Sequence, residues 1–173
     1  MESKPLDDAP EGISIFVDTN VLIYHLLEDE IYGVSCRNFL RRVEEKSVTG
    51  FTSPTVISET LFLYLRFWVI ANKKIAPKKV LDYIKRHRGV TKEVDFPKPQ
   101  TLFTIFKILS INNAVLRTSY DMTERYNLLP NDAINTALIR RYGLPAIATR
   151  DDDFDDIDGI VVFKPEASSP SLA

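Results

Sequence analysis

The stretch Ile13-Ser14-Ile15-Phe16-Val17-Asp18-Thr19-Asn20 decides the fold of this chain. Its first five residues are mostly apolar and β-branched, as in a buried strand, whereas the last three are poor strand formers. An uninterrupted apolar strand is typical of a parallel sheet that helices cover on both faces. The sequence therefore predicts a buried strand that ends at Asp18.

Helical and strand patterns alternate along the rest of the chain. We expect helices over residues 34–46, 54–71, 101–110, 119–127 and 131–142, and strands over 51–52, 144–149 and 160–163. This alternation predicts an α/β fold with a central parallel sheet. Ligands of such sheets bind beyond the carboxyl ends of the strands, so Asp18 and Asp151 should face one crevice.

The composition limits the class of protein. The chain has 173 residues, of which 45% are hydrophobic and 27% charged, as expected for one folded domain. We expect this domain over residues 13–164, with flexible tails at 1–12 and 165–173. The net charge of −2 argues against a uniformly basic nucleic-acid-binding protein, so any polyanion must be met by a local patch.

The cysteine content and the apolar segments of the sequence predict a cytoplasmic protein without a membrane partner. Cys36 is the single cysteine, which excludes an internal disulfide and fits a reducing compartment. Residues 1–12 are acidic and lack the apolar core of a signal peptide. Residues 54–71 are long enough to span a bilayer but contain Glu59 and Arg66, so we interpret them as a buried helix.

Four acidic residues are candidates for a functional role, and each could instead have a purely structural role. Asp18 can be a turn residue or helix cap, and Glu59 can face solvent on a narrow stripe of its helix. Asp132 at a helix start gains from the helix dipole. Asp151 opens a run of six carboxylates in residues 151–158, and such runs are usually solvated loops.

If these carboxylates share one crevice, they need a bound cation. Two like charges 4 Å apart repel by ~4 kcal/mol at an effective dielectric constant near 20. A set of oxygen ligands without Cys or His suits Mg²⁺ or Mn²⁺. Such an ion activates water and polarises phosphate, so the pattern favours phosphodiester hydrolysis.

Four segments together resemble the PIN domain family. They are Val17-Asp18-Thr19-Asn20-Val21-Leu22, Thr52-Ser53-Pro54 leading to Ser58-Glu59, Pro130-Asn131-Asp132-Ala133-Ile134, and Thr149-Arg150-Asp151-Asp152-Asp153-Phe154. The resemblance spans about residues 13–164. It implies a three-layer α/β/α sandwich, an acidic Mg²⁺ or Mn²⁺ site, and cleavage of RNA that leaves 5′-phosphate and 3′-hydroxyl ends.

The resemblance also assigns roles by position. It implies that Asp18, Glu59, Asp132 and Asp151 are catalytic and bind the metal. The doubled acids leave the last position of the pattern ambiguous, so Asp153 is the candidate for a fifth metal ligand. Thr19, Asn20 and Thr149 match polar positions that orient a carboxylate or water, with turn formation as the alternative role.

Residues 72–119 depart from the compact pattern of the family because they form a long, basic segment. From 73 to 92, eight Lys or Arg residues stand against Asp82. We expect RNA binding by Lys73, Lys74, Lys78, Lys79, Lys85, Arg86 and Arg88, with a solvated helix face as the alternative. Tyr83 and His87 are four residues apart and could stack a base, although a Tyr at an apolar position is more often part of the core.

The leading hypothesis is a metal-dependent endoribonuclease that resembles VapC-type toxins and has a cognate antitoxin. The alternatives are a housekeeping RNA-processing PIN nuclease and a catalytically weak module that binds RNA or protein. A haloacid-dehalogenase-like phosphatase is disfavoured because Asn20 stands where a second Asp is needed. The excess apolar surface of residues 54–71 predicts a homodimer.

Overall fold

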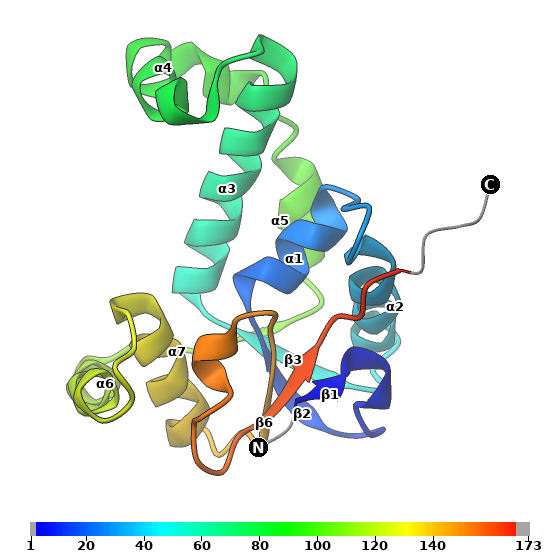
Figure 1. Ribbon diagram of the computed structural model, residues 1–173, viewed down its shortest axis with the longest axis vertical. Helices are drawn as coiled ribbons and strands as arrows, with labels where there is room; N and C mark the ends of the chain where they lie inside the picture. Colours follow the sequence, from blue (N-terminus) through cyan, green and yellow to red (C-terminus); the bar gives the residue numbers. More distant parts are fainter. Residues whose placement is uncertain (1–2, 169–173) are drawn as a thin grey trace.

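The computed structural model describes residues 3–168. Its centre is a six-stranded sheet with the order β1-β6-β5-β2-β3-β4, in which all neighbouring strands are parallel (Figure 1). The strands are β1 (Lys4–Pro5), β2 (Ser14–Val17), β3 (Thr49–Thr52), β4 (Lys107–Ile108), β5 (Ala146–Ala148) and β6 (Val161–Lys164). Phe16 of β2 lies in register with Phe51 and Ile147, so the predicted first strand is central.

Helices form the two outer layers. They are α1 (Thr19–Leu26), α2 (Gly33–Glu44), α3 (Pro54–Lys73), α4 (Val80–Arg86), α5 (Pro97–Phe103), α6 (Asn113–Tyr126) and α7 (Pro130–Arg141). Four short 3₁₀ turns are η1 (Leu6–Asp8), η2 (Pro77–Lys79), η3 (Arg88–Lys92) and η4 (Asp152–Phe154). In Figure 1, α6 and α7 lie to the left of the sheet and α2 to the right, and α1 is seen above the strands. The predicted three-layer α/β/α sandwich is confirmed.

Two apolar clusters hold this arrangement. The larger one surrounds the sheet and contains Phe16, Phe39 and Ile147, which have no exposed surface. The smaller one packs Val80 and Val90 against the second half of α3. We call residues 73–92 the arm; in Figure 1 it stands at the end of α3 remote from the sheet.

Two helix boundaries differ from the sequence prediction. The helix expected over 101–110 is α5, which ends at Phe103, and residues 107–108 instead pair with β3 as edge strand β4. The helix expected over 119–127 begins at Asn113, because the Asn112 side chain accepts hydrogen bonds from the backbone N–H groups of Ala114 and Val115.

Both segments that we expect to be tails contact the domain within the residues that the structure describes. Residues 4–5 pair with β6, and the neighbouring Leu6 is fully buried. Arg42 Nη1 donates to the carbonyl of Asp7, at 3.2 Å, and so fixes the following turn. At the other end, Ser168 N donates to the Ile31 carbonyl at 2.7 Å. Residues 1–2 and 169–173 lie outside the described residues.

Helix α3 is less buried than predicted. Within the described part of the chain it is the one helix long and apolar enough to cross a bilayer by length and composition, a test that the core helices of globular proteins also pass. In its most apolar 18-residue window, 28% of the residues are buried. Phe62 and Phe67 are 42% and 44% exposed, so α3 offers apolar surface beyond its own domain.

Gly50 of β3 gives a test of the packing between the sheet and its helices. A Cβ atom there would lie 2.6 Å from Val43 Cγ1 and 2.8 Å from Phe106 Cδ1. We expect Gly50→Ala to lower the free energy of unfolding by ~1–3 kcal/mol through overpacking, measured by urea denaturation. Gly89→Ala is the matched control because its Cβ would meet no atom within 4 Å. Equal denaturation midpoints for the two variants would contradict this account of the packing.

Candidate active site

Asp18 is the buried centre of the site. It follows β2 directly and takes the N-cap position of α1, and its backbone N–H donates to the Ala148 carbonyl of β5 at 3.0 Å. The side chain is 6% exposed. Its Oδ2 atom accepts hydrogen bonds from Thr149 Oγ1 at 2.8 Å and from Asn20 Nδ2 at 3.0 Å. Two donors from different elements therefore fix one carboxylate at the carboxyl edge of the sheet.

Asn20 and Thr149 also connect this carboxylate to the loop after β5. Asn20 Oδ1 accepts from the backbone N–H of Arg150 at 2.9 Å, and Thr149 Oγ1 accepts from that of Asp151 at 3.0 Å. Asn20 Nδ2 donates to Thr149 Oγ1 at 2.9 Å, which closes the network. Because Thr149 is fully buried, these bonds place Asp151 relative to Asp18 without competition from water.

Glu59 reaches the site from α3. Ser53 caps this helix by accepting a hydrogen bond from Val56 N, and Pro54 occupies the first helical position. Glu59 then lies in the second turn, half-buried, where Thr19 Oγ1 donates to its Oε2 at 3.0 Å. Thr19, the first residue of α1, therefore links this helix to the acid on α3.

Asn135 is a residue of the site region that sequence analysis missed. It is 1% exposed, and its Oδ1 accepts from Ser53 Oγ and Thr55 Oγ1, both at 3.1 Å. These bonds fasten the start of α3 to α7. Asn135 lies three residues after Asp132, hence on the same face of α7, but this spacing is the only signal in the sequence and does not reveal that the amide is buried.

Asp132, Asp151 and Asp153 form the open side of the site. Each offers a carboxylate oxygen, and these oxygens lie within 4.8 Å of one another. Asp151 Oδ1 accepts from the backbone N–H of Asp153 at 3.0 Å, which shapes the turn that brings Asp153 to the cluster. Asp152 differs from both neighbours, because it pairs with Lys164 at 2.7 Å.

The electrostatics of the site reflect crowded negative charge. Burial raises the pKa of Asp18 to about 6, aided by the charges of Glu59 and Asp151 and opposed by the hydrogen bond from Thr149. Burial, followed by the charges of Asp18, Asp151, Asp153 and Glu59, raises the pKa of Asp132 to about 7. An all-oxygen, strongly acidic set of this kind fits a hard divalent cation such as Mg²⁺ or Mn²⁺.

A groove lies beside Glu59. It has a volume of about 420 Å³ and is lined by residues of α3 and the start of α7, namely Pro54, Thr55, Ser58, Glu59, Phe62 and Asn131. We call it the site groove. Its position lets an extended ligand reach Glu59 along the exposed surface of α3.

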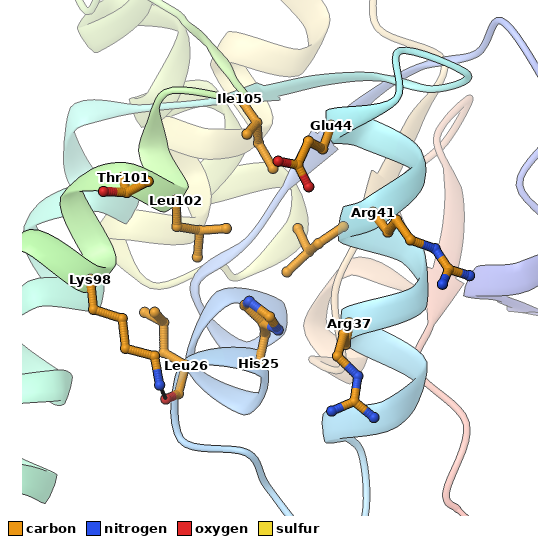
Figure 2. A pocket seen from close by; sticks show the side chains of 10 residues that line it. His25, Leu26, Arg37, Arg41, Glu44, Lys98, Thr101, Leu102 and Ile105 are labelled. Atoms are coloured by element: carbon orange, nitrogen blue, oxygen red, sulfur yellow. Dashed lines mark hydrogen bonds between the residues drawn. The ribbon is translucent and has the colours of Figure 1, made fainter.

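A second pocket lies away from the acids. Figure 2 shows it between α1, α2 and α5, with His25, Arg37 and Lys98 among its lining residues. Burial and the charges of Lys98 and Arg37 lower the pKa of His25. None of the five acids described above lines this pocket, so it is separate from the acidic cluster.

The basic residues predicted to bind RNA lie on the arm and are not part of the acidic cluster. They are exposed apart from Lys73, whose Nζ donates to Glu93 Oε2 at 2.6 Å. The acidic cluster and the basic surface of the arm therefore lie at opposite ends of α3.

The raised pKa values predict the pH dependence of stability without metal. Because Asp18 and Asp132 hold protons more tightly in the folded chain, the folded state binds more protons than the unfolded chain between about pH 4 and pH 7. We expect the free energy of unfolding in EDTA to fall as pH rises through this window, measured by urea denaturation.

Asp132→Asn should flatten this fall and stabilise the metal-free protein at pH 7.5, because it removes one of the repelling charges. The exposed Asp121→Asn on α6 is the control and should keep the wild-type slope. If Asp132→Asn keeps that slope as well, the crowding of charge at the site is not what sets the pH dependence.

Comparison with known proteins identifies the family. The sequence profile of the PIN domain matches residues 15–160. Ribonuclease VapC2 of Methanocaldococcus jannaschii is 35% identical over 154 residues, which cover 89% of this chain and 95% of that protein. Ribonuclease VapC6 of the same organism is 26% identical over 152 residues, which cover 87% and 97% of the two chains.

Solved structures show the same fold at low identity. VapBC2 from Rickettsia felis, bound to a DNA fragment from its promoter, aligns with a TM-score of 0.56 at 14% identity, covering 89% of this chain and all of that one. Mycobacterium tuberculosis VapC20, a toxin that cleaves the sarcin-ricin loop, aligns with a TM-score of 0.52 at 19% identity, covering 82% and 92%. The family match spans most of the chain and includes all five acids of the site. The chain belongs to the PIN domain family.

Proposed function

We propose that this chain is a metal-dependent endoribonuclease that hydrolyses phosphodiester bonds of RNA and is the toxin of a toxin–antitoxin pair. The observation that carries the proposal is the gathering of carboxylates from the end of β2, from α3, from α7 and from η4 at one edge of the sheet. Two relatives named as VapC ribonucleases align over nearly their whole length and support the same activity.

In the proposed mechanism the chain holds the ligands of Mg²⁺ or Mn²⁺ in fixed positions. Asp18, Glu59, Asp132, Asp151 and Asp153 would hold the cation, which when bound polarises the scissile phosphate and lowers the pKa of a water molecule. Thr149 and Asn20 keep Asp18 in one orientation, and Thr19 does the same for Glu59. We assign Asp132, half-buried at the open side, the further role of accepting a proton from the attacking water with the carboxylate oxygen that does not hold the cation.

The RNA strand would lie in the site groove and continue toward the arm. Lys74, Lys78, Lys79, Lys85, Arg86 and Arg88 are exposed there and can neutralise phosphates. Lys73 contributes less, because its ammonium group is already paired with Glu93.

The proposed partner is a cognate antitoxin in the cytoplasm. The support comes from related proteins: the R. felis structure is a VapBC pair, and a further neighbour with a TM-score of 0.52 at 14% identity is DNA-bound VapBC from Salmonella typhimurium. The toxin role is favoured over housekeeping RNA processing because the relatives with detectable sequence similarity are named VapC.

A homodimer is the proposed state of the free protein. Phe67 is 44% exposed and lies beside Trp68 and Leu27 in a shallow pocket, so α3 carries an apolar face that its own domain leaves open. Phe62 and Phe67 are separated by about 140° around the helix axis, at about 100° per residue. A second copy can therefore cover the Phe67 face while Phe62 remains beside the site groove.

The activity is tested by cutting of a mixed single-stranded RNA pool by the purified protein. We expect cleavage with Mg²⁺ or Mn²⁺ and none in EDTA. The double variant Asp18→Asn, Asp132→Asn should reduce the rate by at least about 100-fold, the size expected when groups that stabilise the transition state are removed. Asp156→Asn is the control, since this exposed residue lies in the same acidic run outside the proposed ligand set. Equal cutting by the double variant would overturn the assignment.

The dimer is tested by light scattering at micromolar concentration. The wild-type protein should have about twice the 19.7 kDa mass of the chain. Phe67→Asp should shift it toward the monomer, because a charge in an apolar interface is costly. Tyr120→Asp, at a 70% exposed aromatic residue on α6, should leave the mass unchanged. A monomeric wild-type protein contradicts the proposal.

A further inference from the structure

The arm contains a pocket that the proposed cleavage chemistry does not use. Its volume is about 570 Å³, and its lining includes three basic side chains, Lys74, Lys79 and Arg86, and two aromatic rings, Tyr83 and His87. We call it the arm pocket. A cavity that combines cations with aromatic rings has the two features by which proteins hold single-stranded nucleic acid.

The aromatic rings are already arranged as a stack. The ring centroids of Tyr83 and His87 are 4.3 Å apart, and the ring planes differ by 22°. Tyr83 is half-buried against the smaller apolar cluster, whereas His87 is exposed. His87 Nδ1 lies 3.0 Å from the Tyr83 carbonyl, which restricts rotation of the imidazole. A base can therefore stack on this pair with little loss of side-chain freedom.

The charge of the arm pocket suits a phosphate backbone. The ion pairs found among residues 3–168 do not include Lys74, Lys79 or Arg86; their cations are Arg41, Lys73, Lys98, Arg125, Arg150 and Lys164. Asp82 is the one carboxylate among the lining residues, so the pocket has a net charge of +2 with His87 neutral. These cations are free to meet an anionic ligand.

Helix α3 connects the arm pocket to the catalytic acids. Glu59, Phe62, Arg66 and Lys73 share one face of this helix. Phe62 lines the site groove, and the Arg66 guanidinium lies 5.7 Å from the centre of its ring, so an aromatic–basic surface continues along this face. Glu59 and Lys73 are 14 residues apart in the helix, which corresponds to roughly 21 Å at 1.5 Å per residue.

We propose that the arm pocket binds one nucleotide of the single-stranded RNA substrate and so sets which bond is cut. Its base stacks on the Tyr83–His87 pair, and Lys79, Arg86 and Lys74 contact the neighbouring phosphates. At 3.4 Å per stacked nucleotide, the span of α3 from Glu59 to Lys73 places the near edge of the arm pocket roughly six positions from the scissile bond. The inference rests on the proposed ribonuclease function and adds a second, non-catalytic contact with the same substrate.

The first test measures binding without cleavage. The probe is a fluorescein-labelled, mixed-sequence 20-nucleotide RNA, and its affinity is measured by anisotropy in EDTA. We expect His87→Ala to weaken binding about tenfold, through loss of one stacked base. His87→Phe should keep near wild-type affinity, because an aromatic ring remains. His87 is exposed, so both variants should unfold at the wild-type temperature.

The salt dependence of the same assay separates phosphate contacts from stacking. Lys79→Ala, Arg86→Ala should make the slope of log affinity against log salt shallower by about 1.4, at 0.7 per phosphate of a single strand. Lys4→Ala, Arg37→Ala removes equal charge from exposed positions on β1 and α2 and should leave the slope unchanged. Equal affinities for wild type and His87→Ala, or equal slopes for the two double variants, would overturn the arm pocket as an RNA site.

The second test asks whether the pocket acts at a fixed distance. With Mg²⁺ present, RNAs that end ten nucleotides beyond the cut on one side should be cut less efficiently by His87→Ala than by wild type, at limiting substrate. RNAs shortened to three nucleotides on that side should be cut equally by both proteins. If His87→Ala still cuts less efficiently than wild type whichever side of the RNA is shortened, the proposed spacing is wrong. Absence of cutting by wild type would refute the ribonuclease function, and the binding assay would still decide the arm pocket.

Discussion

The buried carboxylate of Asp18 is the constraint on which the rest of the site depends. Its position at the end of the central strand takes it out of water and brings it near Glu59, Asp132 and Asp151, so its charge is unfavourable in the folded chain without a cation. Thr149 and Asn20 compensate part of this cost by hydrogen bonds, and the same two side chains orient the loop that carries Asp151. The two residues that reduce the cost of burying Asp18 therefore also position the loop that carries Asp151.

The positions of Asp18, Asp132 and Asp151 in the fold could be predicted because each is set by the strand or helix next to it in the sequence. Apolar residues 13–17 identify β2, and Asp18 must then lie at the carboxyl edge of the sheet. Asp151 follows β5 in the same way. Asp132 lies in the first turn of α7, where the start signal of the helix, Pro130, is visible in the sequence.

The features that sequence analysis missed depend on contacts between distant segments. Asn135 reads as an ordinary polar helix residue until Ser53 and Thr55 are brought against it. Strand β4 has two exposed residues and forms only because β3 offers a free edge. Likewise, residues 4–8 are polar enough to suggest a tail, but burial of Leu6 and pairing with β6 hold them in the domain. Such elements carry little local signal, because tertiary contacts supply most of their stability.

Helix α3 is held in place at both ends by different interactions. Its first turns must be rigid, since Ser53, Thr55 and Glu59 join the start of the helix to Asn135 and Thr19. Its remaining length is held by a separate apolar cluster that includes Val69, Val80 and Val90. Helix α3 therefore runs without a break from Glu59 to Lys73, where the arm begins, and the smaller apolar cluster packs the arm against this helix. A helical connection keeps the distance between two RNA contacts nearly constant, which is what recognition of a strand at a fixed spacing from the cut requires.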